Sequence, residues 1–434
     1  MKRKRPSWFT LAYPILFVVL DGVGDLPVKE YENRTPLEAA STPALDRLTV
    51  RGRMGMVYTV KRGIAPESDA GVFSLLSYDP SRLDLSRGVV EALGAGIDFH
   101  EGDLALRCNF ATAERGQIVD RRAGRNVSTE EASQLAAAIN RNAKLRGFTN
   151  FELKTTIGHR CALVFQGKGR ELSAAISNLD PAYERKGKLT IARTDLRLPT
   201  PIPHCVPLNK TERARKTADL VNKFAAHVHE VLENEQVNAA RRARGDPPAN
   251  FLLMRDAGSR TPNVKTLRQK FGFNGVAVAD MPVELGIAKV VGIDTRVFPP
   301  DHTLAGYSDR ANEATRLLGT YDFVYVHLKG PDEPGHDGDF EGKRRAIEEI
   351  DAGFFSKLGG LTDTVVCVTA DHSTPCVAKG HTADPVPILI AGPGVNHDGS
   401  KRFTEGYGKR GAIGTIEHGY LIMKVLKKQS RPGN

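Results

Sequence analysis

The chain has 434 residues, of which 40% are hydrophobic and 26% are charged. This composition excludes a fibrous or wholly disordered protein, and the length predicts two domains. The formal net charge of +10 favours an anionic partner, which can be nucleic acid, a membrane surface or a phosphorylated metabolite. The five cysteines are scattered without a CxxC pair, so we expect no disulfide framework, no cysteine-ligated zinc and a reducing, cytoplasmic location.

The first predicted element is an apolar run at residues 15–20, which follows a basic amino terminus as in a signal peptide. However, Pro14 interrupts the segment, the run is short, and Asp21 follows it without a small-residue cleavage site. We therefore predict a buried strand at 15–20. No stretch of the sequence approaches transmembrane length.

Further elements follow in alternation along both ends of the chain. Helices are predicted over 36–51 and 343–358, and short apolar runs predict buried strands at 323–327 and 365–369. Apolar strands that alternate with helices imply an α/β doubly wound core.

The middle of the chain is richer in arginine, lysine and turn residues, and contains its own long helical candidate at 211–234. We interpret it as a domain inserted between two halves of the core. The predicted core domain is 1–88 with 290–434, and the predicted inserted domain is 89–289.

Acidic and histidine residues cluster just after the predicted strands. In an open parallel sheet, functional groups collect beyond the carboxyl ends of the strands. Individually such residues are more often helix caps or surface groups. Together they supply the carboxylate and imidazole ligands of a dinuclear site for ions such as Mn²⁺, Zn²⁺ or Mg²⁺. The residues are Asp21, Asp332, His336, Asp371, His372 and His381.

Asp332 and His336 have the spacing of a pair on one helical face. The neighbouring Pro331, Pro334 and Gly335 argue against a helix there. We therefore predict a loop at this point.

Ser68 precedes a helical stretch, where a serine is usually only a cap. Such a position also offers backbone N–H groups to an arriving phosphate. A serine hydroxyl is a weak nucleophile that needs a base or a metal ion, and no GxSxG context surrounds Ser68. Activation by a metal ion is the better interpretation.

Long ordered motifs extend this pattern over most of the chain. They are LDGxGD at 20–25, TPLEAA at 35–40, SD at 68–69, YDP at 78–80, EALGAGI at 91–97, RCNFAT at 107–112, DRRAGR at 120–125, DExGHDGD at 332–339, ADHSTP at 370–375 and HTADPVP at 381–387. In these motifs the sequence resembles the archaeal-type 2,3-bisphosphoglycerate-independent phosphoglycerate mutases of the alkaline phosphatase superfamily. The resemblance implies an alkaline-phosphatase-like doubly wound core sheet with a large inserted α/β domain.

The resemblance also implies roles for individual residues. Asp332, His336 and His381 match the ligands of one metal ion, whereas Asp21, Ser68, Asp371 and His372 match those of the other. Arg121, Arg122 and Arg125 match an arginine cluster for the phosphate and carboxylate of the substrate, with Arg122 and Arg125 expected to act in catalysis. His159, Arg160 and Arg255 are further candidates for substrate binding. Without the resemblance, the arginines would be interpreted as a solvated basic face.

The activity implied is that of an isomerase in glycolysis and gluconeogenesis, which interconverts 3-phosphoglycerate and 2-phosphoglycerate through a phosphoserine. We expect two divalent ions, Mn²⁺ first with Zn²⁺, Mg²⁺ or Co²⁺ as alternatives, and no 2,3-bisphosphoglycerate. The expected partner is a small phosphorylated metabolite, not nucleic acid or a membrane. The sequence does not indicate an oligomeric state.

The sequence departs from the family pattern at a few positions. Glu67 and Asp256 replace residues that are usually small, Leu285 replaces a residue that is usually basic, and Pro331 and Pro334 flank Asp332. These departures leave the matched ligands intact and bear on the identity of the substrate.

Two alternative functions remain open. A phosphatase, a phosphonate hydrolase, another phosphomutase or a kinase resembling homoserine kinase can use the same metal core, although no GxxxxGK[ST] loop is present. A nucleic-acid-binding protein fits the positive charge, but no zinc-finger, RNA-recognition or helix-turn-helix signature supports it.

Overall fold

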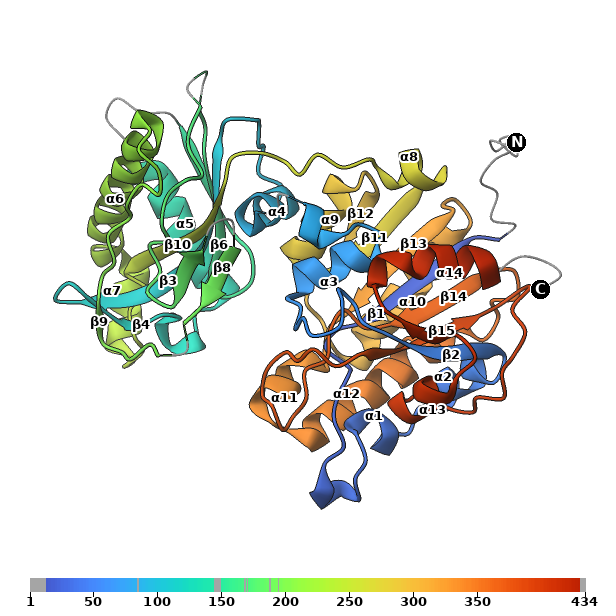
Figure 1. Ribbon diagram of the computed structural model, residues 1–434. Coiled ribbons are helices and arrows are strands. Elements are labelled where there is room, and N and C mark those ends of the chain that lie inside the picture. The colour runs from blue at the N-terminus through green and yellow to red at the C-terminus, as the bar shows by residue number, and fades with distance from the viewer. Residues whose placement is uncertain are drawn as a thin grey trace. The chain divides into compact units, whose positions relative to one another are not determined.

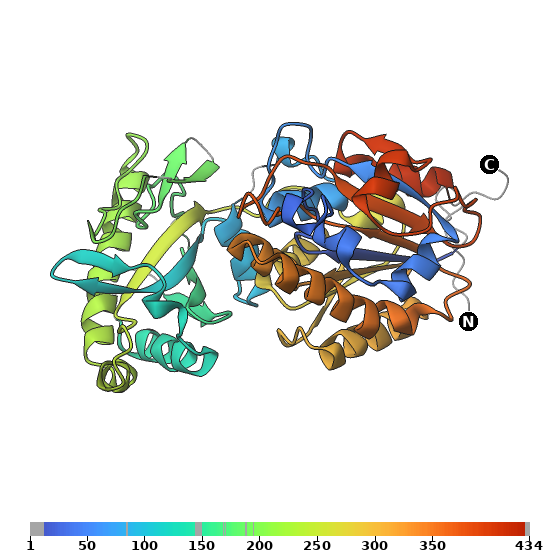
Figure 2. The same cartoon turned by 90° about the horizontal axis from the view of Figure 1, so that it is seen from below.

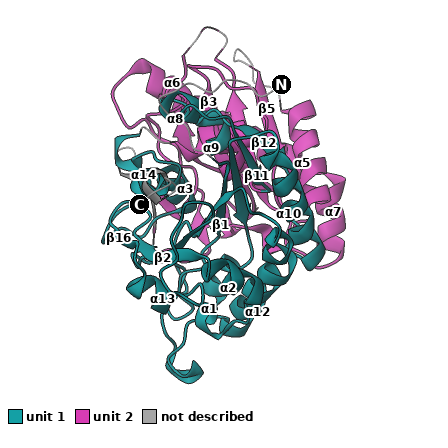
Figure 3. Ribbon diagram, turned by 90° about the vertical axis from the view of Figure 1, so that its right-hand side faces the viewer, with its two compact units in different colours: residues 1–83, 264–280, 287–434 teal, residues 84–263, 281–286 magenta. Residues whose placement is uncertain are grey.

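The computed structural model describes residues 13–83, 86–143, 150–167, 169, 171–186, 189–193 and 195–429. They form two compact units, which Figure 3 colours separately. Unit 1 comprises residues 1–83, 264–280 and 287–434, and unit 2 comprises residues 84–263 and 281–286. Helix α9 (Pro282–Val290) begins in unit 2 and ends in unit 1.

Unit 1 is built on an eight-stranded sheet (Figure 1). The order across the sheet is β12 (Asp294–Val297), β11 (Gly275–Ala279), β13 (Phe323–Leu328), β1 (Ile15–Leu20), β14 (Val365–Thr369), β15 (Val386–Ala391), β2 (Gly52–Val57) and β16 (Gly414–Ile416). The strands from β12 to β14 are parallel, whereas β15 runs antiparallel to both its neighbours. The parallel strands therefore end at one common edge.

Helices cover both faces of this sheet, with α10 and α12 on one face and α3 and α14 on the other (Figures 2 and 3). The helices of unit 1 are α1 (Pro36–Ala39), α2 (Pro43–Thr49), α3 (Ser68–Leu75), α8 (Leu267–Phe271), α10 (Leu304–Leu318), α11 (Asp332–Asp337), α12 (Phe340–Gly353), α13 (Glu405–Arg410) and α14 (Ile422–Gln429). Short 3₁₀ turns are η1 (Lys29–Tyr31), η2 (Pro80–Arg82), η4 (Phe355–Leu358) and η5 (Gly419–Leu421). Because β1, β13 and β14 are covered on both sides, every residue in them is buried.

Unit 2 contains a six-stranded antiparallel sheet and a separate hairpin. The sheet consists of β5 (Phe151–Thr155), β6 (Arg160–Phe165), β3 (Leu104–Glu114), β4 (Gln117–Asp120), β9 (Thr200–Pro201) and β10 (Phe251–Gly258), and the hairpin of β7 (Tyr183–Lys186) and β8 (Leu189–Ala192). Its helices are α4 (Arg87–Gly94), α5 (Thr129–Asn142), α6 (Glu212–Glu233) and α7 (Gln236–Ala243), with a 3₁₀ turn η3 (Ala123–Arg125).

The two faces of the unit 2 sheet differ in what covers them. One face packs against α5 and α6 in a large apolar core. The other face packs against α4. Its apolar contacts with this helix are limited to the region around Ala105, Ala162 and Val164. Further along the same face the side chains are charged, beginning with Arg107 on β3.

The prediction of an α/β core with an inserted α/β region is confirmed. The strands at 15–20 and 365–369 and the helix at 211–234 agree closely with β1, β14 and α6. The predicted helix at 343–358 begins earlier, at Phe340, and its last turn is the separate η4.

Two local predictions are wrong. The helix predicted at 36–51 is two helices, because the chain is extended at Ala40 and α2 restarts with Pro43 in its first turn. The loop predicted around Asp332 is the short helix α11. Pro334 is tolerated because it lies in the first helical turn, where backbone N–H groups have no partner within the helix.

Candidate metal centre and arginine cluster

The carboxyl edge of the unit 1 sheet carries a buried group of acidic and imidazole side chains. Asp21 follows β1, His327 lies near the end of β13, and Asp371 follows β14. Their potential ligand atoms lie within 4.8 Å of one another, and all three residues are buried. The parallel register that aligns these strands explains why residues so distant in sequence meet.

His372 and Ser68 face the same point. His372 Nε2 lies 3.5 Å from Asp21 Oδ1 and 3.3 Å from Asp371 Oδ2. His327 Nε2 lies 3.6 and 3.8 Å from the same two oxygens. Ser68 Oγ, at the start of α3, is 3.2 Å from His372 Nε2. Two imidazoles therefore face two carboxylates, with the serine hydroxyl beside them.

A second group adjoins the first. Asp332 Oδ2 is 3.6 Å from His336 Nε2, and Asp332 Oδ1 is 3.6 Å from His381 Nε2. The rings of His372 and His381 stack with centroids 3.7 Å apart. Thr374 joins the groups, because its hydroxyl donates to Asp332 Oδ1 at 2.7 Å and lies 2.9 Å from His372 Nδ1.

The hydrogen bonds fix which imidazole nitrogens carry a proton. His381 Nδ1 donates to the Pro66 carbonyl at 2.8 Å, and His336 Nδ1 donates to the Lys379 carbonyl at 3.3 Å. Both rings then turn an Nε2 lone pair inwards, and these atoms are only 3.2 Å apart beside a carboxylate. Two converging lone pairs repel each other unless a proton or a metal ion lies between them, so this set of donors can hold a metal ion.

Two glycines allow the close packing of these loops. Gly22 has φ of +60°, and a Cβ atom there would lie 2.6 Å from Asp332 Oδ1. A Cβ atom on Gly71 of α3 would lie 2.4 Å from the Asp371 carbonyl oxygen. A larger residue at either position would push ligand-bearing segments apart.

The pKa values of the two buried carboxylates in the first group are shifted in opposite directions. Burial alone would raise the pKa of Asp21, but Lys329, with Nζ 3.1 Å from Asp21 Oδ2, and the nearby histidines hold that pKa well below its usual range. Burial and the charge of Asp21 raise the pKa of Asp371 well above its usual range. Asp21 Oδ1 and Asp371 Oδ2 are buried without a hydrogen-bond partner among the described residues. A divalent cation would satisfy both oxygens, so the first group also fits a metal ion.

The structure excludes the interpretation of Asp21 and Ser68 as helix caps. No helix starts directly after Asp21, so Asp21 is not a helix cap. Ser68 is the first residue of α3, and Glu67 occupies the cap position. His327 and Lys329 were missed by the sequence analysis, although a histidine within the apolar run of β13 is a usable signal.

The predicted arginines lie together in unit 2. Asp180 accepts two hydrogen bonds from Arg121, at 2.8 and 2.9 Å, and one from Arg255 at 2.9 Å. The Tyr183 ring packs against both guanidinium groups, with distances of 5.2 and 4.7 Å from its centroid. Two of the predicted arginines are therefore held by one buried carboxylate.

Arg122, Arg125 and Arg160 surround the same region. Burial and then these cations lower the pKa of His159 to about 4, with Arg160 and Arg122 the strongest neighbours. Burial, Arg125 and Arg121 likewise lower the pKa of Arg122. The region is therefore strongly electropositive, as an anion site requires.

Arg107 extends this cationic face and was not predicted as a site residue. It is paired with Arg255 in the register of β3 and β10, and its Nε lies 3.0 Å from Glu91 Oε1 on α4. Burial and Arg87 lower its pKa to about 10. The alternation of Arg107 and Asn109 along an otherwise apolar strand could have indicated the charged face.

The departures from the family pattern have clear positions. Asp256 has φ of +59°, a left-handed conformation that favours the glycine usual there. Leu285 is buried in α9, and Glu67 contributes to the electrostatic surroundings of His381. None displaces a candidate ligand.

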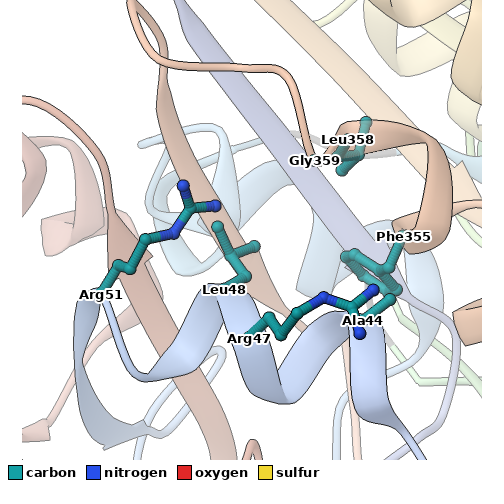
Figure 4. Close-up of a pocket in the computed structure, with 7 residues that line it drawn as sticks. All are labelled: Ala44, Arg47, Leu48, Arg51, Phe355, Leu358 and Gly359. Atoms are coloured by element: carbon teal, nitrogen blue, oxygen red, sulfur yellow. The ribbon is translucent and has the colours of Figure 1, made fainter.

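A cavity of about 330 Å³ lies elsewhere in unit 1, between α2 and η4 (Figure 4). It contains none of the candidate residues. Its lining consists of Ala44, Arg47, Leu48, Arg51, Phe355, Leu358 and Gly359. In the described part of the chain, no helix is both long and apolar enough to cross a membrane.

Comparisons with known proteins agree with one another. The family model described as 2,3-bisphosphoglycerate-independent phosphoglycerate mutase matches residues 50–238. An Aeropyrum pernix protein of that name is 42% identical over 421 residues, which cover 94% of this chain and 97% of the relative. A Thermococcus kodakarensis protein of the same name is 37% identical over 417 residues, covering 95% and 96% of the two chains.

Two solved structures have the same fold along nearly their whole length. The cofactor-independent phosphoglycerate mutase from Thermoplasma acidophilum matches with a TM-score of 0.64 and 32% identity, covering 96% of this chain and 100% of that chain. A Pyrococcus horikoshii protein matches with a TM-score of 0.77 and 30% identity, covering 97% and 98%.

Proposed function

This chain belongs to the 2,3-bisphosphoglycerate-independent phosphoglycerate mutase family, and from that premise we propose that it interconverts 3-phosphoglycerate and 2-phosphoglycerate through a phosphoserine at Ser68. The observation that carries the proposal is the position of Ser68 Oγ, 3.2 Å from His372 Nε2 and next to the buried carboxylates of Asp21 and Asp371. A serine among metal-type ligands at a helix N-terminus suits phosphoryl transfer better than acyl transfer.

Two divalent ions are the proposed cofactors, and no bisphosphoglycerate is required. One ion would be held by Asp332, His336 and His381, and the other by Asp21, Ser68, Asp371 and His372, with His327 as an additional ligand suggested by its geometry. When bound, such ions supply Lewis acidity that favours the serine alkoxide and offsets charge on the phosphoryl oxygens. Oxygen and imidazole ligands suit Mn²⁺, our first choice, and also Zn²⁺, Mg²⁺ or Co²⁺.

Ser68 carries the covalent step. Its Oγ gives up its proton and bonds to phosphorus while the bond from phosphorus to the 3-oxygen of the substrate breaks, and that oxygen takes up a proton. In the second half, the 2-hydroxyl of the retained glycerate loses its proton and bonds to phosphorus, which restores Ser68. No water is consumed, so both halves conserve the phosphate ester.

Lys329 has a supporting role at this step. Its ammonium lies 3.1 Å from Asp21 Oδ2 and keeps that carboxylate ionised. An ionised Asp21 is the form that binds a cation.

The arginine cluster is the proposed site for the anionic groups of the substrate. Arg121 and Arg255 are fixed by Asp180, so they supply positive charge in a rigid arrangement. Arg122 and Arg125 are proposed to act on the reacting groups, and His159 and Arg160 to bind the substrate beside them. Planar guanidinium groups suit both phosphate and carboxylate.

We also propose a cytoplasmic location, supported by five cysteines that are all free. The proposed partner is the phosphorylated metabolite alone.

The test is to incubate the Mn²⁺-loaded protein with 3-phosphoglycerate, without bisphosphoglycerate, and to follow the products by ³¹P NMR. We expect 2-phosphoglycerate to appear without free phosphate. Release of phosphate alone would reassign the chain as a hydrolase, and the absence of both products would exclude phosphoglycerate as the substrate.

A further inference from the structure

A lysine buried beneath the metal centre is not explained by the proposed reaction. Lys343 lies in the first turns of α12 and its side chain is fully buried. Its ammonium donates to the Asp25 carboxylate at 2.8 Å, to the Gly24 carbonyl at 3.0 Å and to the Thr374 carbonyl at 2.9 Å. All three donors of the ammonium group are therefore used.

Asp25, the partner of this lysine, also forms several hydrogen bonds. Its side chain is fully buried and accepts hydrogen bonds from the backbone N–H groups of Leu26 and Cys376. Its own backbone N–H donates to Glu405 Oε1 at 3.2 Å. The Lys343–Asp25 pair is thus connected to several backbone segments and has no remaining donor on the lysine for a substrate.

The segments held by Lys343 are those that carry the candidate ligands. Gly24 lies three residues after Asp21, in the loop that follows β1. Thr374 lies two residues after His372, in the loop that follows β14, and its hydroxyl contacts both His372 Nδ1 and Asp332 Oδ1. Lys343 itself follows α11, which bears Asp332 and His336.

The loops also contact each other through backbone hydrogen bonds. Thr374 N–H donates to the Gly24 carbonyl at 3.0 Å, the same oxygen that accepts from Lys343. One ammonium group therefore sits where the loop after β1 meets the loop after β14. A shift of either loop would lengthen bonds to this single point.

Stability alone is a weak reason for such a pair. Removing two charges from water is costly, and buried ion pairs are often no more stabilising than well-packed apolar side chains. An ion pair of this kind fixes the positions of the groups around it. Residues that orient metal ligands in this way alter metal affinity.

We propose that Lys343 is a positioning residue that holds the loops after β1 and β14 in register, so that Asp21, His372 and Asp332 converge on the metal ions. The proposal rests on the dinuclear site of the proposed function. Lys343 is not expected to contact the substrate.

The test measures Mn²⁺ affinity by isothermal titration calorimetry in the double variant Asp25→Asn/Lys343→Met, which removes the pair without leaving a lone buried charge. Asp25→Asn/Lys343→Gln, which also leaves no lone charge and keeps amide N–H donors for the carbonyls, is measured alongside so that a folding failure of the first variant leaves the test intact. Thermal unfolding of each metal-free variant separates stability from affinity. We expect the Kd for Mn²⁺ to rise about 10- to 100-fold, and kcat to recover largely at saturating Mn²⁺.

The matched control is Asp351→Asn on the same helix. Asp351 is buried and accepts hydrogen bonds from Ala44 N–H at 3.0 Å and Leu45 N–H at 2.7 Å, so it anchors α2, which bears no candidate ligand. We expect this control to lower the Tm without changing the Kd.

Two outcomes overturn different claims. Wild-type protein that binds two ions, together with folded Lys343 variants of unchanged Kd, would overturn the positioning role alone. Wild-type protein that binds fewer than two ions would overturn the proposed function, and with it the role of Lys343.

Discussion

The two units concentrate charge of opposite sign at their candidate sites. In unit 1, Asp21 and Asp371 each bury a carboxylate oxygen that has no hydrogen-bond partner among the described residues. In unit 2, one carboxylate, Asp180, serves both Arg121 and Arg255, while Arg122 lies beside further cations. The first arrangement suits a cation and the second an anion, so the difference supports the proposed metal-binding role for unit 1 and the proposed substrate-binding role for unit 2.

The largest expected effect tests the unit 1 site through Ser68, its proposed nucleophile. Ser68→Ala should lower kcat by at least about 10⁴-fold, because the oxygen that accepts phosphorus is removed. Mn²⁺ affinity should fall by about tenfold, because Ser68 is one of the proposed ligands, and the Tm should change little. The measurement is steady-state kinetics together with mass spectrometry of the protein after incubation with 3-phosphoglycerate.

Ser74→Ala is the matched control, since Ser74 is buried on the same helix. It should keep both activity and phosphoenzyme. Full turnover in Ser68→Ala would show that Ser68 does not carry the phosphoryl group.

The next effect tests the cationic site of unit 2. Arg122→Met should lower kcat/KM by about 100-fold, the usual scale for losing one charged group that stabilises the transition state. Mn²⁺ affinity should not change, which would separate the two units functionally. Arg213→Met is the control, because Arg213 is an exposed residue of unit 2 that pairs with Glu171.

An Arg122→Met enzyme with unchanged kcat/KM would remove Arg122 from the substrate site. Parallel losses of kcat/KM and Mn²⁺ affinity would contradict the separation of roles between the units.

A third prediction concerns a buried acid of unit 1 that lacks a cation of its own. Burial raises the pKa of Glu405 to about 7, and the negative charge of nearby Glu38 adds to this rise, while the hydrogen bond from Thr35 and the charge of Lys343 lower the pKa only in part. The folded protein therefore retains the Glu405 proton at a pH where the unfolded chain has lost it. The stabilisation from this group is fully present below pH 4.5, which is the usual pKa of a glutamate side chain. It is lost as the pH rises through about 7, the pKa of Glu405 in the folded protein.

The measurement compares the free energy of unfolding of wild type and Glu405→Gln at pH 5 and pH 8. The variant should gain about 2 kcal/mol relative to wild type over this interval. The amide can still accept from Asp25 N–H and donate to Thr35, so the contacts are kept. A difference that stays constant with pH would show that Glu405 is ionised in the folded protein.

The predictability of the two sites also differs, for a physical reason. The candidate ligands Asp21, Asp371 and His372 follow apolar strands, and the ends of parallel strands meet at one edge, so their proximity could be predicted. Arg107 and Asp180 could not be found in this way. The alternation along β3 indicates a polar face at Arg107, but the pairing of Arg107 with Arg255 depends on the antiparallel register of unit 2, and Asp180 lies in a loop, so periodicity does not bring these residues together.

Errors in the unit 1 prediction have local causes. Pro334 was interpreted as a helix breaker, but in the first turn of α11 its missing N–H costs nothing. His327 was correctly predicted to lie in a strand, but because it stands within the apolar run of β13 it was not considered as a ligand. Both cases show that a residue type predicts a role only when its position within the element is known.

The smallest expected effect sharpens the description of the cation site. His327 Nε2 lies 3.6 Å from Asp21 Oδ1, too long for a hydrogen bond but suitable for two ligands that share an ion. If His327 contributes to binding, His327→Gln should weaken Mn²⁺ binding by about tenfold. His418→Gln is the control, because His418 belongs to unit 1 and contacts only the Val60 carbonyl in the described hydrogen bonds.

Calorimetry gives the affinity, and electron spin-echo spectroscopy of the Mn²⁺-loaded protein gives the coupling to imidazole nitrogen. Loss of one nitrogen coupling in His327→Gln would identify His327 as a ligand. Unchanged couplings with weaker binding would instead assign His327 to orienting Asp21 and Asp371, since a side chain behind the ligands alters affinity without touching the ion. Unchanged affinity would restrict the unit 1 site to the ligands predicted from the sequence.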